Sequence, residues 1–159
     1  MGVRGIEETS QYLTFTLGAE KYAVDVAHIR EILEYTTITR LPQAPEFMRG
    51  VINLRGSVVP VVDLRQKFGM SPTEQTIATS IIVVEILLDN ETILIGALAD
   101  SVQEVLELEP EQIEESPRIG VGPQVDFIRG MGRNNGQFIM LLDIDKVFSF
   151  GERFCMETV

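Results

Sequence analysis

Alternating apolar and polar residues predict a chain built mainly of β-strands. Residues 12–17 (YLTFTL) alternate as a half-buried strand does, and the alternation resumes at residues 22–26 after a four-residue connection. These two segments predict a hairpin. Residues 80–88 form a longer apolar run typical of a buried strand, and residues 92–98 follow it after an Asp-Asn-Glu turn. They predict a second hairpin.

Shorter apolar segments between these hairpins predict a third hairpin and two helical turns. Residues 26–34 fit one face of a helix and one face of a strand, so we expect a helical turn that passes into a strand. Residues 45–50 begin with proline and end with glycine, which favours a short helical turn. Residues 51–54 and 58–62 predict paired strands around Arg-Gly-Ser. Because Pro60 has no N–H, the second strand should be an edge or bulged there.

The segments after these strands predict a helix start and a surface crossing. Asp63 can cap a helical turn, and Gln66 lies three residues on, as in a capping box. Residues 99–107 have the same mixed helix and strand character as residues 26–34. Residues 109–122 are acidic and contain prolines, so we expect them to cross the surface.

An internal repeat relates two parts of the chain. Residues 47–68 align without a gap with residues 127–148. Residues 29–34 also match residues 102–107 at an offset of 73 residues. The six identical positions are Phe47/Phe127, Arg49/Arg129, Gly50/Gly130, Gly56/Gly136, Asp63/Asp143 and Phe68/Phe148. We interpret the glycines as turn residues, the aspartates as helix caps and the phenylalanines as core. The repeat predicts two small β-barrels related by an approximate two-fold axis.

Two positions differ between the copies while the frame around them is kept. Asn53 is replaced by Arg133 and Arg55 by Asn135. A shared framework therefore does not explain Asn53 or Arg55. Arg55 is either an ordinary solvated side chain, or it presents its guanidinium to a partner or pairs with a carboxylate such as Glu31.

The charge excludes some classes of partner. The net charge is -11 and the pI about 4.5, so the chain repels phosphate backbones and anionic membranes. Neither nucleic-acid binding nor direct membrane contact is expected. Cys155 is the one cysteine, which favours a reducing compartment. No apolar run approaches the ~20 residues that span a bilayer. We expect a cytoplasmic protein whose residues 1–10 and 151–159 are flexible tails.

Catalytic and metal-binding patterns are missing from the sequence. His28 is the one histidine, and no serine lies in a Gly-x-Ser-x-Gly setting. Cys155 has only Arg153 nearby and is interpreted as a bystander thiol. Cysteine and histidine do not occur at metal-ligand spacing. The expectation is a protein that is not an enzyme and has no cofactor or metal.

Two long motifs resemble the CheW-type coupling proteins of bacterial chemotaxis. They are FTLGAEKYAVDVAHIREIL at residues 15–33 and FMRGVINLRGSVVPVVDLRQKFG at residues 47–69, supported by the weaker second copy. The resemblance runs from about Gln11 to Ser149. It implies a mainly β fold of two SH3-like five-stranded barrels with short helical turns, forming a single domain over residues 11–150 of two intertwined subdomains.

The resemblance also implies a function. Such proteins are adaptors that link the cytoplasmic tips of chemoreceptors to the regulatory domain of a CheA-type histidine kinase, in arrays at the membrane. The family's Glu and Arg positions match Glu31 and Arg55, and its receptor-facing groove would involve apolar residues near Ile29, Ile38 and Val102. With Asn53, these residues form the predicted binding site. Two alternatives are the same adaptor fold in a pilus or gliding motility pathway and an RNA-binding SH3-like barrel, which the charge disfavours.

Overall fold

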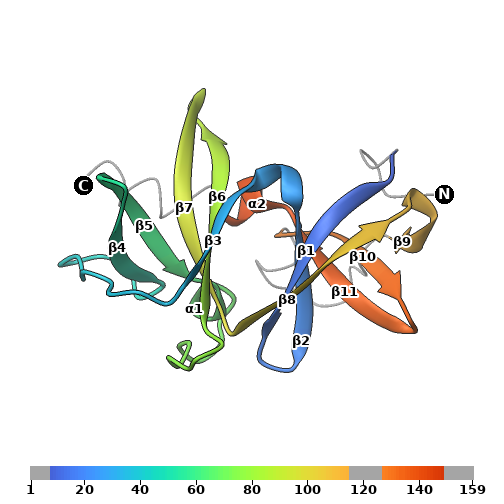
Figure 1. The fold of residues 1–159 in the computed structure, drawn as a ribbon, viewed down its shortest axis with the longest axis horizontal. Coiled ribbons are helices and arrows are strands. Elements are labelled where there is room, and N and C mark those ends of the chain that lie inside the picture. The colour runs from blue at the N-terminus through green and yellow to red at the C-terminus, as the bar shows by residue number, and fades with distance from the viewer. Residues whose placement is uncertain (1–7, 115–126, 149–159) are drawn as a thin grey trace.

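Two β-sheets lie side by side in the computed structural model, which describes residues 8–114 and 127–148 (Figure 1). The five-stranded sheet has the order β3-β6-β7-β5-β4. Its strands are β3 Ile29–Glu34, β4 Met48–Leu54, β5 Ser57–Asp63, β6 Ser80–Leu88 and β7 Glu91–Ala99. The six-stranded sheet has the order β8-β1-β2-β11-β10-β9. Its strands are β1 Ser10–Leu17, β2 Glu20–Asp25, β8 Ser101–Leu108, β9 Ile113–Glu114, β10 Ile128–Asn134 and β11 Gln137–Leu142. The predicted fold class is confirmed, with the two-residue β9 as the sixth strand of one sheet.

The two copies of the repeat exchange their first hairpins. The β1–β2 hairpin precedes β3 in the first copy but pairs with β8 and β11 of the second. The β6–β7 hairpin opens the second copy but pairs with β3 and β5 of the first. The registers are equivalent, because Val61 lies opposite Gly96 in one sheet and Leu141 opposite Ala23 in the other. Each sheet therefore contains strands from both copies.

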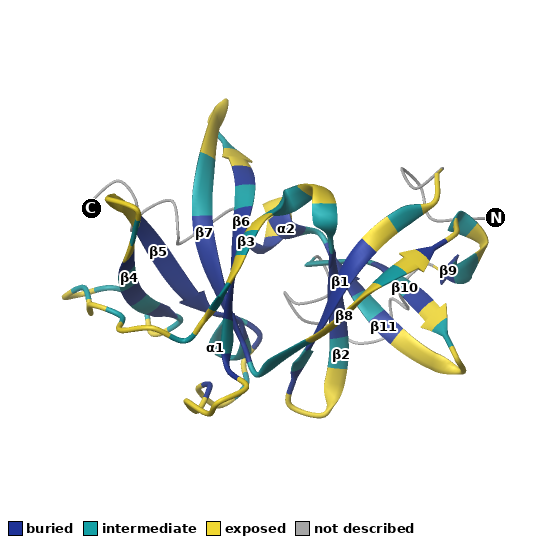
Figure 2. Ribbon diagram, in the orientation of Figure 1, coloured by how far each residue is buried: buried dark blue, intermediate teal, exposed yellow. Residues whose placement is uncertain are grey.

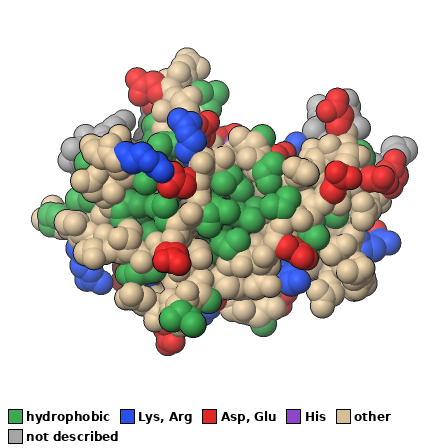
Figure 3. All heavy atoms as spheres, viewed as in Figure 1, with side chains coloured by type: hydrophobic (Ala, Val, Ile, Leu, Met, Phe, Trp, Pro, Cys, Tyr) green, Lys and Arg blue, Asp and Glu red, His purple; other side chains and the backbone are tan. Residues whose placement is uncertain are grey.

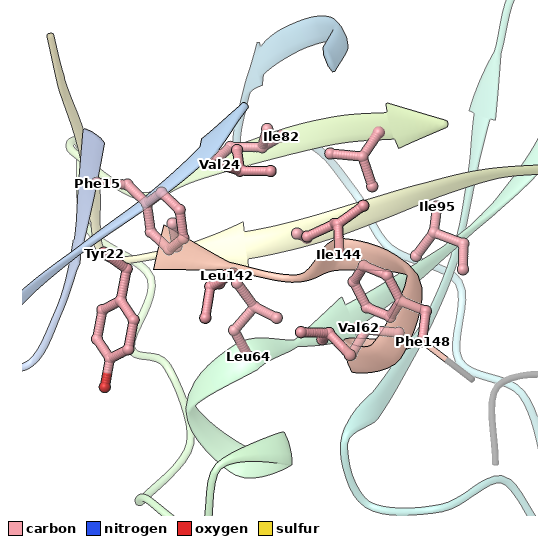
Figure 4. Packing of buried hydrophobic residues seen from close by; sticks show 14 of the residues in the cluster. Phe15, Tyr22, Val24, Val62, Leu64, Ile82, Ile95, Leu142, Ile144 and Phe148 are labelled. Atoms are coloured by element: carbon pink, nitrogen blue, oxygen red, sulfur yellow. The ribbon is translucent and has the colours of Figure 1, made fainter. Parts of the chain in front are cut away.

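A shared core lies between the sheets. One buried cluster takes Phe15 and Val24 from the six-stranded sheet and Ile82 and Ile95 from the five-stranded sheet (Figure 4). Two smaller clusters of buried residues belong to one sheet each, the first to the six-stranded sheet and the second to the five-stranded sheet. Burial of this apolar surface is the main favourable term that joins the two sheets, because it removes hydrocarbon from water.

Two short helices follow the repeated hairpins. Helix α1, Leu64–Lys67, has Asp63 as its N-cap, and the Asp63 carboxylate accepts a hydrogen bond from the Arg65 amide. Helix α2, Ile144–Val147, has Asp143 as its N-cap, with the Lys146 amide as donor. Gln66 makes no capping-box contact at α1. The expected capping box is therefore wrong, although the aspartate cap is present in both copies.

Several local expectations need correction. The first hairpin has a two-residue turn, since Leu17 lies opposite Glu20, rather than a four-residue connection. No helix forms at residues 45–50: the Met48 amide closes one turn onto Pro45, and β4 begins at Met48. Residues 101–108 form a strand throughout, whereas residues 26–34 do contain the expected helical turn, as a 3-10 turn before β3.

Pro60 lies inside the sheet yet breaks no ladder. Strand β5 has β7 on one side and β4 on the other, so it is not an edge. The ladder with β7 begins only at Val61, and Pro60 has a register partner on the β4 side alone. The missing N–H is therefore accommodated where the strand is paired on one side. Figure 2 shows β5 buried along much of its length, whereas β3 and β8 carry exposed residues.

Gly50 and Gly130 lie within strands and not in the turns expected for them. Both occur where the register of the repeated hairpin shifts, opposite Val61 and Leu141. Gly50 has a φ of 146°, and a Cβ there would lie 2.1 Å from the carbonyl oxygen of Thr39. A side chain at this position would collide with backbone, which explains the glycine.

Candidate interaction site

The candidate site begins at the turn between β4 and β5. Arg55 and Gly56 are its two central residues, with φ of 52° and 87°. Two positive φ values define the turn that matches the twist of paired strands. Asn135 and Gly136 form the equivalent turn with φ of 51° and 77°. Asparagine tolerates this conformation, whereas arginine rarely adopts it, so the turn geometry does not account for Arg55.

A bidentate ion pair orients the side chain of Arg55. Its Nη1 donates to Oε1 of Glu31 at 2.7 Å, and its Nη2 donates to Oε2 at 2.9 Å. The pair links β3 to the turn after β4, and β3 and β4 are the two edge strands of the five-stranded sheet. A backbone bridge pairs Thr39, in the loop that follows β3, with Val51 of β4. Both contacts hold the two edges of the sheet near each other, as in a barrel.

The ion pair is accessible to solvent. The Arg55 side chain is 72% exposed and the Glu31 side chain 25% exposed. The hydrogen bond from Arg55 lowers the pKa of the Glu31 carboxyl below its usual value, with its positive charge adding to the effect. The same contact raises the pKa of Arg55. Both groups are ionised at neutral pH, and the guanidinium keeps an exposed face.

The neighbouring Asn53 has a local role. Its Oδ1 accepts a hydrogen bond from the Gly56 amide at 2.8 Å, which braces the turn that carries Arg55. The equivalent Arg133 forms an ion pair with Glu114 of β9 and lies over the Phe138 ring at 5.9 Å. The two barrels thus differ in the side-chain contacts made at their equivalent hairpin turns.

Two of the three predicted groove residues pack against the same core cluster, and the third packs against another. Ile29 and Val102 are half-buried and pack against the core cluster between the sheets. Ile38 is half-buried against the separate core of the five-stranded sheet. Hydrophobic side chains gather across the junction of the two sheets on the face shown in Figure 3.

Four exposed apolar residues lie outside the predicted site. Ile32 and Val105 are 45% and 53% exposed and correspond to each other at the repeat offset of 73. Val58 and Phe138 are 60% and 52% exposed and correspond at the offset of 80. The repeat contained this signal, because both copies keep an apolar residue at a solvent-facing position where folding alone does not require one.

His28 and Cys155 are not expected to be catalytic, and the structure describes the first of them. His28 is half-buried at the end of the 3-10 turn Val26–His28. Cys155 lies outside the described residues, as do both expected tails except for residues 8–10. Among residues 8–114 and 127–148, no three His, Cys, Asp or Glu side chains converge on a possible metal position. In the same part of the chain, no helix is long and apolar enough to cross a bilayer.

Comparison with known proteins identifies the family. A family model described as a CheW-like domain matches residues 11–152. The chain belongs to the CheW family. The CheW relatives include the chemotaxis protein CheW of Klebsiella aerogenes, 36% identical over 94% of this chain and 87% of that protein. CheW of Rhizobium meliloti is 34% identical over 90% of each chain.

A solved CheW structure shares the fold. The scaffolding protein TtCheW from Thermoanaerobacter tengcongensis superposes with a TM-score of 0.77 at 30% identity, covering 87% of this chain and 92% of that one. The resemblance found in the sequence is therefore confirmed. Membership of the CheW family supports the assignment as a chemotaxis adaptor.

Proposed function

We propose that this chain is a non-enzymatic adaptor that couples chemoreceptor cytoplasmic tips to the regulatory domain of a CheA-type histidine kinase. The observation that carries the proposal is the exposed Arg55–Glu31 pair at a turn where the second copy has asparagine. An arginine at positive φ is disfavoured by local sterics, so its presence there suggests a role outside folding.

The form of the pair suits recognition by a protein surface. A guanidinium fixed by a carboxylate is oriented before any partner arrives, which reduces the entropy lost on binding. Its unpaired N–H groups face solvent and suit a carboxylate or carbonyl of the partner. Charged groups of this kind set the register of an interface, while nearby apolar side chains contribute the buried area.

Apolar residues supply the buried area of the proposed interface. Ile29 and Val102 lie at the junction of the sheets, where we place the receptor tip. Ile32, Val58, Val105 and Phe138 are exposed on both barrels and offer area to the kinase domain. The adaptor would work in the cytoplasm and be recruited to membrane receptor arrays by these contacts, with no catalytic group taking part.

Replacing Arg55 with asparagine tests the proposal. Arg55→Asn removes the guanidinium but keeps a residue that the equivalent turn already uses. We expect an unchanged circular dichroism spectrum and an unfolding midpoint close to that of the wild type, because relief of backbone strain at positive φ offsets the loss of the Glu31 pair. Co-sedimentation with receptor and kinase fragments should be reduced. Asn135→Gly, which alters only the equivalent turn of the other barrel, is the matched control and should assemble normally. Normal assembly of Arg55→Asn would contradict the site assignment.

A further inference from the structure

Between β7 and β8 the chain passes from the five-stranded sheet to the six-stranded sheet through a single residue. Asp100 alone separates β7 of the five-stranded sheet from β8 of the six-stranded sheet. Its amide donates to the carbonyl oxygen of Thr16 in β1 at 3.1 Å. The hydroxyls of Thr16 and Ser101 lie 2.7 Å apart and form a hydrogen bond beside it. The start of β8 is therefore anchored to β1 at this crossing.

The carboxylate of Asp100 joins groups from both sheets. Its Oδ2 accepts from the Gly18 amide, in the β1–β2 turn, at 2.7 Å. The same oxygen accepts from Nη1 of Arg65, in α1 after the five-stranded sheet, at 2.8 Å. The side chains of Arg65 and Asp100 are 19% and 26% exposed, so water screens this ion pair less than it screens pairs on the open surface.

Arg65 is held rigidly for this contact. Its Nε donates to the carbonyl oxygen of Ser71 at 2.9 Å, and its Nη2 donates to the Ser71 hydroxyl at 3.0 Å. Gly18 has a φ of 63°, and a Cβ there would lie 3.0 Å from Met70 Cε. The β1–β2 turn is thus seated closely against the loop that Arg65 organises.

The second copy makes the corresponding contact with the opposite charge. Asp145 occupies the position equivalent to Arg65 at the repeat offset of 80. Its Oδ1 accepts directly from the Leu87 amide, near the end of the β6–β7 hairpin, at 3.3 Å. Asp145 can bind a backbone amide alone, whereas Arg65 needs the Asp100 carboxylate between itself and Gly18. The three-part contact is therefore particular to the first copy.

We propose that Gly18, Arg65 and Asp100 form an inter-sheet latch that fixes the angle between the sheets and positions Val102 for receptor binding. Val102 lies two residues after Asp100 on β8, so movement at the latch changes where its side chain meets the core cluster. Arg65 and Asp100 are positioning residues here and touch no partner. This inference rests on the proposed function for the receptor contact.

The latch can be tested by measuring the geometry between the sheets. Spin labels at Glu91→Cys on β7 and Glu107→Cys on β8, in the full chain carrying Cys155→Ser, report the distance between exposed positions of the two sheets. Arg65→Met and Asp100→Asn should broaden the distance distribution. Arg65→Lys should restore it in part, since lysine can still pair with Asp100. The control Arg30→Gln breaks the Arg30–Glu85 ion pair, which lies within the five-stranded sheet, and should leave the distribution unchanged.

A binding measurement on the same variants completes the test. We expect Arg65→Met and Asp100→Asn to bind a receptor-tip fragment about tenfold more weakly, the scale of one lost charge-assisted hydrogen bond. An unchanged distance distribution, or a broadened one with wild-type affinity, would overturn the latch proposal. Failure of the wild-type chain to bind the fragment would instead overturn the proposed function. In that case the distance measurement alone would test the inter-sheet contact.

Discussion

Replacing Asp63 would remove the acceptor for four hydrogen-bond donors. The carboxylate is fully buried. Its Oδ2 accepts from Arg49 Nη1 and the Thr73 amide, both at 2.9 Å. Its Oδ1 accepts from the Thr73 hydroxyl at 2.7 Å and the Arg65 amide at 3.0 Å. The side chain thus joins β4, α1 and the loop at Thr73. In the second copy, Asp143 is half-buried, and its carboxylate accepts a longer hydrogen bond from the Lys146 amide, at 3.3 Å.

Because Asp63 and Asp143 lie in different environments, we expect their replacement to lower the free energy of unfolding by different amounts. Breaking a buried ion pair costs about 3–5 kcal/mol, and the 21% exposure of Arg49 places this one near the lower end. The buried Thr73 amide left without an acceptor adds about 1 kcal/mol. Asp63→Ala should therefore lower the free energy of unfolding by about 4 kcal/mol. Asp143→Ala removes a helix cap, which is worth about 1 kcal/mol.

Urea unfolding followed by circular dichroism measures both values. Domains of this size are stable by about 5–15 kcal/mol, so a loss of about 4 kcal/mol removes a large part of the stability. Thr73→Val supplies a milder step, because it removes only the hydroxyl donor and should cost about 1 kcal/mol. Equal losses for Asp63→Ala and Asp143→Ala, within about 0.5 kcal/mol, would refute the reasoning from burial and hydrogen-bond number.

Two further predictions concern backbone geometry and pH. Gly50→Ala should lower the free energy of unfolding in urea by about 3 kcal/mol or more, because its Cβ would collide with the Thr39 carbonyl. Gly136→Ala meets open space, so backbone strain should lower the free energy of unfolding by only about 1 kcal/mol. Since Arg55 lowers the pKa of Glu31 in the folded protein, their pair stabilises the fold above the ordinary carboxyl pKa of 4.5, and this contribution is lost as pH falls through the lowered value. The difference in urea midpoint between wild type and Glu31→Gln should accordingly be largest above pH 4.5 and shrink below it; a constant difference would exclude this linkage.

The hydrophobic pattern and the internal repeat predicted most of the fold. Residues 80–88 form a strand with the predicted bounds, because an apolar run interrupted only at Glu85 suits a strand whose centre is buried on both faces. The pairing of each first hairpin with the opposite copy was not predictable. Alternation shows which face of a strand is buried but not which sheet supplies its neighbours.

The candidate site was predicted from differences between the copies and from the family resemblance. Arg55 and Glu31 were found because a shared framework left Arg55 without a structural reason, and the structure places them in a bidentate pair. Arg65 and Asp100 were missed because their contact depends on the crossing between the sheets. The buried role of Asp63 was underestimated for the same reason, since Thr73 reaches it from a loop that has no counterpart in the repeat.

The exchange of hairpins also governs the order in which a chain leaving the ribosome can fold. The strands of the five-stranded sheet are contiguous, from residue 29 to residue 99, and all are available once residue 99 has emerged. The β1–β2 hairpin emerges first, but its partners β8 and β11 end only at Leu108 and Leu142. At bacterial rates of synthesis this wait lasts on the order of ten seconds. During that time the apolar faces of β1 and β2 are exposed, which makes this hairpin the segment of the nascent chain most in need of protection from aggregation.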